Sequence, residues 1–176
     1  MNITVYLGSS YGNDPLFRQA ASRLGHWIGE HGHILVYGGS CVGCMGVLAD
    51  AVLDAGGKVI GIEPRFMVER ELQHNGIDQL IEVDTMAERM TKMIELGDAF
   101  VALPGGVGTL EEISEVASRI RLNLTDAPCV FYNVDGFYDD LQAFFRRMLA
   151  AGFIEPDQFA KITFALTLDE VVAALS

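Results

Sequence analysis

The sequence predicts an α/β fold of the doubly wound type, with a mainly parallel sheet and helices on both of its faces. Short, continuously apolar runs alternate with longer stretches of helical character along the whole chain, a pattern typical of parallel strands buried on both sides. Glycine-rich loops follow three of the apolar runs. The length of 176 residues fits one domain, since domains typically hold about 100–200 residues. No repeat, low-complexity tract or linker interrupts the sequence, so we expect a single domain over residues 1–176.

The first predicted strand is Ile3–Leu7, which ends in Gly8-Ser9-Ser10. Asp14-Pro15 then supplies an N-cap followed by proline at the first helical position, and this pair predicts a helix over about residues 15–31. Two more strands, with a helix between them, complete the first half of the chain. They are the strand Ile34–Tyr37, a helix over about residues 43–55, and the strand Val59–Ile62.

The second half continues the same alternation of strands and helices. Its elements are the strand Leu80–Val83, a helix beginning at Thr85, the strand Ala99–Leu103, a helix over about residues 110–122, the strand Cys129–Tyr132, a helix over about residues 137–151, the strand Ile162–Phe164 and a last helix after Thr167. Together they predict a modified Rossmann-like sheet. Ligands of such sheets bind beyond the carboxyl ends of the strands, so we expect a site in the loops after Leu7, Tyr37 and Leu103.

The net charge of the chain restricts the classes of molecule that we expect it to bind. Twelve Lys and Arg residues against 24 Asp and Glu residues give a formal net charge of −12, which is the opposite of the basic surface that binds a phosphate backbone. We therefore expect no nucleic-acid partner and no binding to anionic membrane surfaces. A small anionic substrate would have to be held locally, by backbone N–H groups and a few arginines.

The first residues of the chain and its cysteines indicate the expected cellular location and whether a metal site is expected. The start, MNITVYLGSS, lacks the basic and apolar regions of a signal peptide, and no apolar run approaches the roughly 18 residues of a membrane span. We therefore expect a cytoplasmic protein. The three cysteines are too few for a secreted disulfide framework, and we expect reduced thiols. Cys41-x-x-Cys44 has no second ligand pair at finger-like spacing and the histidines are scattered, so we expect no metal.

The segment Leu103–Glu112, LPGGVGTLEE, carries the strongest functional signal. It lies between a predicted strand and a predicted helix, where its three glycines let the backbone approach a ligand and helix N-terminal N–H groups face an anion. A phosphate fits this description, and the alternative is that the glycines only form a tight turn. The spacing matches neither a P-loop nor GxGxxG. With the loops Gly8-Ser9-Ser10 and Gly38–Gly43, this segment predicts a crevice of nucleotide size.

Glu112 has both a structural and a catalytic interpretation. Thr109-x-x-Glu112 is the pattern of a capping box, in which the glutamate bonds back to the backbone of the N-cap residue. The same pattern occurs at two other predicted helix starts, as Thr85-x-x-Glu88 and Thr167-x-x-Glu170. Only Glu112 lies beside the triple-glycine loop, within reach of a bound sugar phosphate, and this position makes it a catalytic candidate.

Arg89 is the second candidate for chemistry. It lies one turn into the helix that begins near Thr85, and this helix leads into the strand before the glycine loop. Its structural alternative is an exposed salt bridge with Glu88 or Glu95 on a solvated helix face. The residue types alone leave both interpretations open.

Five segments of the chain occur in an order known from one protein family. Pro104–Glu112 fits the motif PGGxGTxxE throughout, Met86–Arg89 matches an arginine segment that precedes it, and Asn133–Tyr138 is similar to NVDGYY. Gly8-Ser9-Ser10 and Tyr37-Gly38-Gly39 also match. With these segments, the chain resembles the Lonely Guy (LOG) family of cytokinin riboside 5′-monophosphate phosphoribohydrolases, which are often mislabelled lysine decarboxylases. The resemblance spans most of the chain.

The resemblance implies hydrolysis of the N-glycosidic bond of a purine nucleoside 5′-monophosphate, AMP or a cytokinin riboside 5′-monophosphate, to the free base and ribose 5-phosphate. It implies Arg89 and Glu112 as the catalytic residues, no cofactor, and a homodimer with the pocket near the subunit interface. The substrate-binding residues expected from the resemblance and the glycine loops are Gly8, Ser9, Ser10, Gly39, Ser40, Glu71, Gly105, Gly106, Val107, Gly108, Thr109, Leu110, Glu111 and Ser118.

Two places depart from the family pattern. Ser40 and Cys41 stand where glycine and serine are expected, and Met90 stands where many members have lysine, so the sequence leaves the base and the need for prenylation open. A nucleotide-binding or sensing module of the same fold, which does not cleave its ligand, is the second hypothesis. A lysine decarboxylase is the third, although none of the three lysines has the setting of a Schiff-base lysine.

Overall fold

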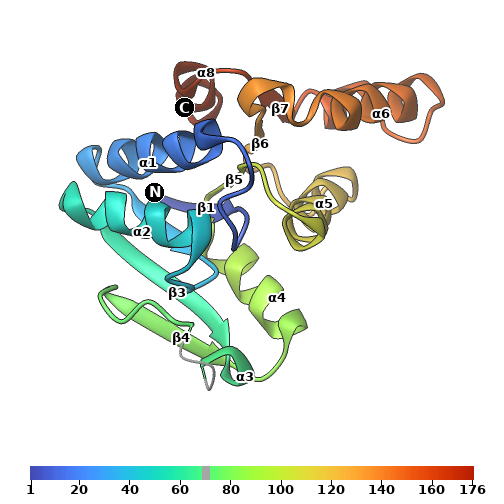
Figure 1. Ribbon diagram of the computed structural model, residues 1–176. Helices are drawn as coiled ribbons and strands as arrows, with labels where there is room; N and C mark the ends of the chain where they lie inside the picture. The colour runs from blue at the N-terminus through green and yellow to red at the C-terminus, as the bar shows by residue number, and fades with distance from the viewer. Residues whose placement is uncertain (69–71) are drawn as a thin grey trace.

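The computed structural model describes residues 1–68 and 72–176. Seven strands form one sheet in the order β4-β3-β2-β1-β5-β6-β7, with helices on both faces (Figure 1). The strands are β1 (Asn2–Tyr6), β2 (Ile34–Tyr37), β3 (Lys58–Pro64), β4 (Gln79–Val83), β5 (Ala99–Ala102), β6 (Cys129–Tyr132) and β7 (Ile162–Ala165). Each neighbouring pair of these strands is parallel. The predicted doubly wound α/β fold is therefore confirmed.

The helices follow the predicted alternation, with three short additions. They are α1 (Pro15–Glu30), α2 (Gly43–Asp54), α3 (Arg65–Val68), α4 (Met86–Leu96), α5 (Val107–Arg121), η1 (Val134–Gly136), α6 (Asp139–Ala150), α7 (Pro156–Phe159) and α8 (Leu168–Leu175). The elements α3, η1 and α7 were not predicted, because three or four residues are too few to show an amphipathic period. Helix α5 begins at Val107 and not near Leu110, because Gly106 is already its N-cap residue.

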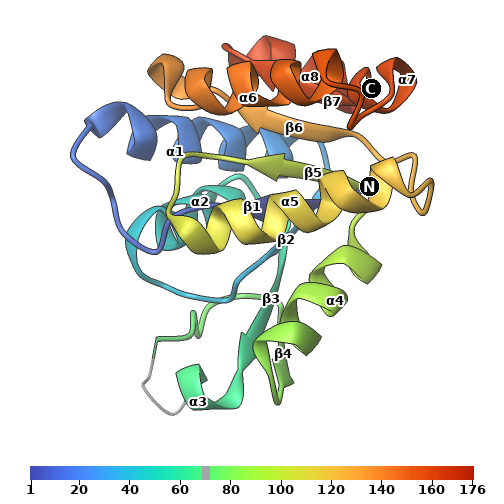
Figure 2. The same cartoon turned by 90° about the vertical axis from the view of Figure 1, so that its right-hand side faces the viewer.

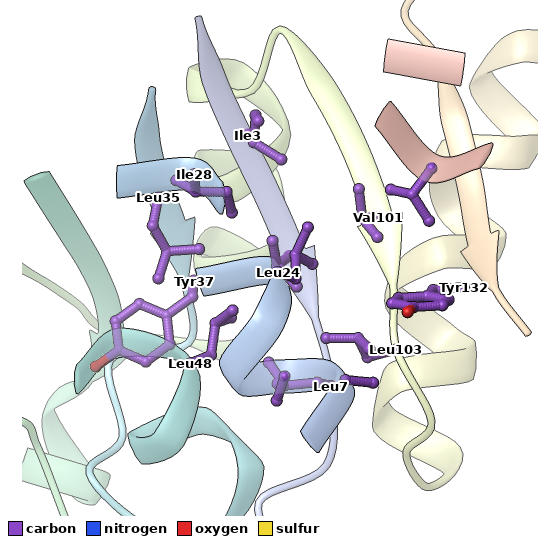
Figure 3. Close-up of a cluster of buried hydrophobic side chains, with 14 of the residues drawn as sticks. Ile3, Leu7, Leu24, Ile28, Leu35, Tyr37, Leu48, Val101, Leu103 and Tyr132 are labelled. Carbon is purple, nitrogen blue, oxygen red and sulfur yellow. The ribbon is translucent and has the colours of Figure 1, made fainter. Parts of the chain in front are cut away.

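Two apolar layers sandwich the sheet. On one face, α1, α2 and α8 pack against the strands, and Figure 3 shows Leu24, Ile28 and Leu48 of α1 and α2 facing side chains of the strands. On the other face, α4, α5 and α6 cover a second cluster that includes Phe100 and Phe131. Figure 2 shows α4, α5 and α6 from this side. Both faces of the central strands are thus buried, which explains why these strands are almost continuously apolar, whereas the edge strand β4 has no buried residue.

The strand order places a topological switch point beside β1. The chain runs outward from β1 through β2 and β3 to β4, and α4 then returns it to the other side of β1, where β5 pairs with β1. The carboxyl ends of β1, β2 and β5 are therefore neighbours, and a ligand crevice is expected there. Among the described residues, no helix is long and apolar enough to cross a membrane.

Candidate active site

A cleft of about 420 Å³ opens at the carboxyl ends of the central strands. The loops after β1, β2 and β5 line it, together with the end of β3 and parts of α4 and α5. The predicted site residues that line it are Gly8, Ser9, Ser40, Arg89, Gly106, Val107, Gly108, Thr109, Glu111 and Glu112. Residues from three glycine-rich loops that are far apart in sequence thus meet at one cleft.

Close backbone contacts hold these loops against one another. The N–H of Gly8 donates to the carbonyl of Pro104 at 3.3 Å and so joins the loop after β1 to the loop after β5. Gly43, the first residue of α2, has a φ of +62°, and a Cβ at this position would lie 2.3 Å from the carbonyl carbon of Ser9. Only glycine adopts this conformation freely and leaves room for the neighbouring loop.

The start of α5 forms one wall of the cleft. Gly106 is the N-cap residue and offers no side-chain bond to the first turn. The N–H of Leu110 donates to the carbonyl of Gly106 at 3.1 Å, so the N–H groups of Val107, Gly108 and Thr109 precede the first backbone bond of the helix. Such N–H groups, together with the helix dipole, favour an anion. This wall is therefore suited to hold a phosphate.

A buried ion pair lies beside the start of α5. Arg89 of α4 is 6% exposed and Glu112 of α5 is 7% exposed. An Nη1 hydrogen of Arg89 is donated to Oε1 of Glu112 at 2.5 Å, and Nε of Arg89 donates to the carbonyl of Ile62, in β3, at 3.0 Å. A Cβ at Gly38 would lie 2.1 Å from Nη2 of Arg89. The guanidinium group is therefore held by β3, α5 and the loop after β2.

Burial and charge act in opposite directions on Glu112. Burial is the larger effect and raises the pKa of its carboxyl group above the usual value, while the charge and hydrogen bond of Arg89 act to lower that pKa. The arginine thus favours the carboxylate form in a place where desolvation disfavours it. The result is an oriented carboxylate in a partly dry cleft, which is an arrangement that can stabilise positive charge on a bound molecule.

The structure decides against the capping-box interpretation of Glu112. The N-cap of α5 is Gly106 and not Thr109, so Thr109 lies inside the first turn. The Glu112 side chain bonds to an arginine instead. At the two other helix starts the threonine caps do form, because the N–H groups of Glu88 and Glu170 donate to the threonine hydroxyls three residues earlier. The two glutamates accept in return from the N–H of the residue before the N-cap, and not from the N-cap itself.

The exposed salt bridge considered for Arg89 is likewise contradicted. The Arg89 side chain is buried and pairs with Glu112, whereas Glu95 pairs with Lys92 on the surface of α4. Glu88 accepts a hydrogen bond from the N–H of Asp84 through its own carboxylate. The amphipathic period of α4 did not reveal which of its charged residues faces the cleft.

The chain is similar in sequence to known proteins. The model of a family described as "Possible lysine decarboxylase" matches residues 45–175. A protein of Rhodococcoides fascians named cytokinin riboside 5′-monophosphate phosphoribohydrolase is 39% identical over 175 residues, covering 99% of this chain and 88% of the relative. The Arabidopsis thaliana protein named cytokinin riboside 5′-monophosphate phosphoribohydrolase LOG3 is 40% identical, covering 98% and 80%.

The chain belongs to the LOG family. Solved structures with the same fold include the Moco carrier protein of Chlamydomonas reinhardtii, with a TM-score of 0.75 and 21% identity over 98% of this chain and 93% of that one. The molybdenum cofactor binding protein of Rippkaea orientalis has a TM-score of 0.72 and 20% identity, with the same coverage. At these identities the likeness concerns the fold alone.

Several predicted residues of this LOG-family chain lie outside the cleft. Ser10 and Gly105 line a smaller neighbouring hollow. Gly39 packs behind the cleft wall, where a Cβ would lie 3.1 Å from the Cβ of Glu63. Leu110 and Ser118 line a separate hollow of about 580 Å³ between α5 and α6, called the α5–α6 groove below. Glu71 lies outside the described residues.

Glu63 lines the cleft but was not predicted. It lies near the carboxyl end of β3, is 1% exposed, and its Oε2 has no hydrogen-bond partner among the described residues. Burial raises its pKa to about 7, although Arg89 acts to lower it. The signal in the sequence was a carboxylate directly after the apolar run Val59–Ile62. Among the described residues, no cluster of three or more His, Cys, Asp or Glu side chains is placed to hold a metal ion.

Proposed function

We propose that this protein hydrolyses the N-glycosidic bond of a purine nucleoside 5′-monophosphate, AMP or a cytokinin riboside 5′-monophosphate, and releases the free base and ribose 5-phosphate. The observation that carries this proposal is the buried Arg89–Glu112 ion pair beside an uncapped helix N-terminus. The names of the relatives, at about 40% identity, support the same reaction.

The phosphate of the substrate is proposed to bind at the start of α5. The N–H groups of Val107, Gly108 and Thr109 are free to bond an anion there, and Gly106 leaves the approach open because it has no side chain. Ser9 lines the same cleft and adds a hydroxyl group. This local cluster of donors offsets the net charge of −12 and fixes the substrate at a point remote from the scissile bond.

Glu112 is proposed to act at the ribose. Cleavage of the bond between C1′ and the base nitrogen develops positive charge on the sugar and negative charge on the base. The carboxylate stabilises the positive charge and orients the water that attacks C1′. The bond from C1′ to the base nitrogen breaks, a bond from C1′ to the water oxygen forms, the water gives up one proton and the departing base takes one up. Arg89 favours the ionised form of Glu112 through its charge and their hydrogen bond, and its cation faces the phosphate or the leaving side.

The test is product release by purified protein. Wild type should release adenine from AMP or from an N6-prenylated analogue, measured by chromatography across a panel of nucleoside monophosphates. Glu112→Gln keeps the shape of the side chain but removes its charge, so we expect loss of turnover with nucleotide binding retained. Wild-type turnover in this variant would overturn the role of Glu112. A folded wild-type protein that binds nucleotides but releases no base would be a binding module instead.

We also propose that two copies associate through the α5–α6 groove. Its rim exposes Leu110, Phe144 and Phe153 at 42%, 54% and 70%. A second copy would cover these side chains and come close to the cleft, since Leu110 follows the cleft loop directly. Phe144→Glu should convert a dimer to a monomer in analytical ultracentrifugation, whereas Leu166→Glu, at an exposed apolar residue outside the groove, should not. An unchanged sedimentation coefficient in Phe144→Glu would exclude this interface.

A cytoplasmic location completes the proposal. All three cysteines are free thiols, and free thiols persist in reducing compartments. Fractionation of cells that produce the protein would test this location, and recovery from a membrane or secreted fraction would contradict it.

A further inference from the structure

Glu63 is a buried carboxyl group that the proposed mechanism does not use. It lies in the cleft wall at the end of β3, and its side chain is almost fully buried. A Cβ on Gly39 would come within 3.3 Å of its Oε2, so the carboxyl group lies against the backbone of the loop after β2. Its Oε2 has no partner among the residues the structure describes. A buried polar atom without a hydrogen bond is costly and calls for an explanation.

The strand order places Glu63 away from the phosphate wall. Its strand, β3, is separated from β5 by β2 and β1, a distance of roughly 14 Å at about 4.8 Å per strand. Arg89 lies between the two ends, because its Nε bonds to the carbonyl of Ile62 and its Nη1 to Glu112. A nucleotide held by its phosphate at α5, with its ribose at Glu112, would point its base toward Glu63.

The surroundings of Glu63 suit a flat, apolar base with a polar edge. Met45, Met67 and Met86 line the same cleft, and so does Leu72. Flexible thioether side chains pack well against aromatic rings. Ser40 also lines the cleft, but its hydroxyl already donates to the carbonyl of Leu72 at 3.2 Å. Glu63 keeps an oxygen without a partner among the described residues, so its carboxyl group is available to read the edge of a base.

We propose that Glu63 accepts a hydrogen bond from the exocyclic amino group of the base, and that it thereby selects 6-aminopurines over 6-oxopurines. This inference rests on the proposed function, since it assumes a purine nucleotide in the cleft. When Glu63 is ionised, a 6-amino group donates N–H to the carboxylate, whereas a 6-oxo group presents a second acceptor and leaves both oxygens unpaired. The neutral acid could donate its own O–H to a 6-oxo group, so the comparison is made well above the pKa of about 7 that burial gives this carboxyl group. An N6-alkylated base keeps one N–H and satisfies the same contact.

The test compares the affinities of AMP, IMP and ribose 5-phosphate by calorimetry. The Glu112→Gln protein serves as the reference, so that the nucleotides survive, and Glu63→Gln is added to it. The amide has the same size but can donate N–H to a 6-oxo group. We expect the added change to weaken AMP binding by roughly ten- to hundredfold, the range for a hydrogen bond to a charged group, and to leave IMP binding equal or tighter.

Ribose 5-phosphate provides the matched control, because it lacks the base. Its affinity should be the same with and without Glu63→Gln, which also shows that the variant is folded. An unchanged ratio of AMP to IMP affinity would overturn the proposal, and so would AMP binding no tighter than ribose 5-phosphate binding. Adenine release by the wild-type protein is measured separately. If the protein discriminates between AMP and IMP but releases no adenine, the proposed role of Glu63 stands and the proposed hydrolase activity is rejected.

Discussion

The Arg89–Glu112 pair leads to a sharp prediction about stability. Both side chains are less than one-tenth exposed, so removal of one partner leaves the other charge buried and unpaired. We consider Arg89→Met, Glu112→Leu and the double variant, which replace charged groups with apolar groups of similar size. If the pair is a coupled unit, the two single changes should each cost more than the double change.

The expected magnitudes follow from the contacts. Breaking a buried ion pair by loss of one partner costs about 3–5 kcal/mol, whereas replacing both partners by apolar side chains is often close to neutral. The double variant still leaves the carbonyl of Ile62 without the Nε donor of Arg89, which adds about 1–2 kcal/mol. The coupling energy between Arg89 and Glu112 should therefore reach about 3 kcal/mol or more.

Urea unfolding at one fixed protein concentration measures this coupling.

The single variant Arg89→Met also tests the direction in which stability changes with pH. Burial raises the pKa of Glu112 and Arg89 lowers it, so the variant carboxyl group has a pKa that is raised further. A raised carboxyl pKa means that stability is lost as pH rises, and the deficit of Arg89→Met should shrink when pH is lowered. Additive single effects, or a deficit that grows at low pH, would refute the coupled pair.

Three further predictions concern other residues. Burial raises the pKa of Glu63 from 4.5 to about 7, so the wild-type protein loses stability as pH rises through this window. The Glu63→Gln variant should lack this pH dependence, and its free energy of unfolding should rise by about 3 kcal/mol relative to wild type across the window. Urea unfolding at several pH values measures the difference. Gly43→Ala should lower the melting temperature more than Gly56→Ala, because both glycines have positive φ but only Gly43 faces backbone at 2.3 Å; equal losses would argue against loop packing. Tyr138→Phe removes the 2.7 Å bond from its hydroxyl to the carbonyl of Leu103 and should cost about 1 kcal/mol in chemical denaturation.

The sequence predicts the strands and the ligand edge well, for one physical reason. A strand buried on both faces is continuously apolar, as Ala99–Ala102 is, and the glycines that follow it indicate where the loop begins. In a parallel sheet those ends meet at one edge, so the sequence alone predicts that the three glycine-rich loops lie together. Short elements such as α7 lack a full period and were missed.

The sequence does not predict which side chains pair across the cleft. Arg89 and Glu112 lie on different helices, and a period of 3.6 residues identifies an apolar face but does not say which charged residue is directed inward. The start of α5 decides the role of Glu112: with Gly106 as N-cap, Thr109 no longer occupies the capping position. Leu110 and Ser118 face the α5–α6 groove, because the residues of one helix point to different sides.

The central position of β1 affects how the chain folds while it is being synthesised. Its first partner, β2, leaves the ribosome soon after it, but Ile3 pairs on the other side with Ala99. Until more than half of the chain has been translated, β1 is therefore an open, apolar edge, which is a place where nascent chains associate wrongly. The start of α5 is translated only after β5, the strand that closes this edge. A nascent chain long enough to bind phosphate at α5 therefore already contains the strand that covers the edge.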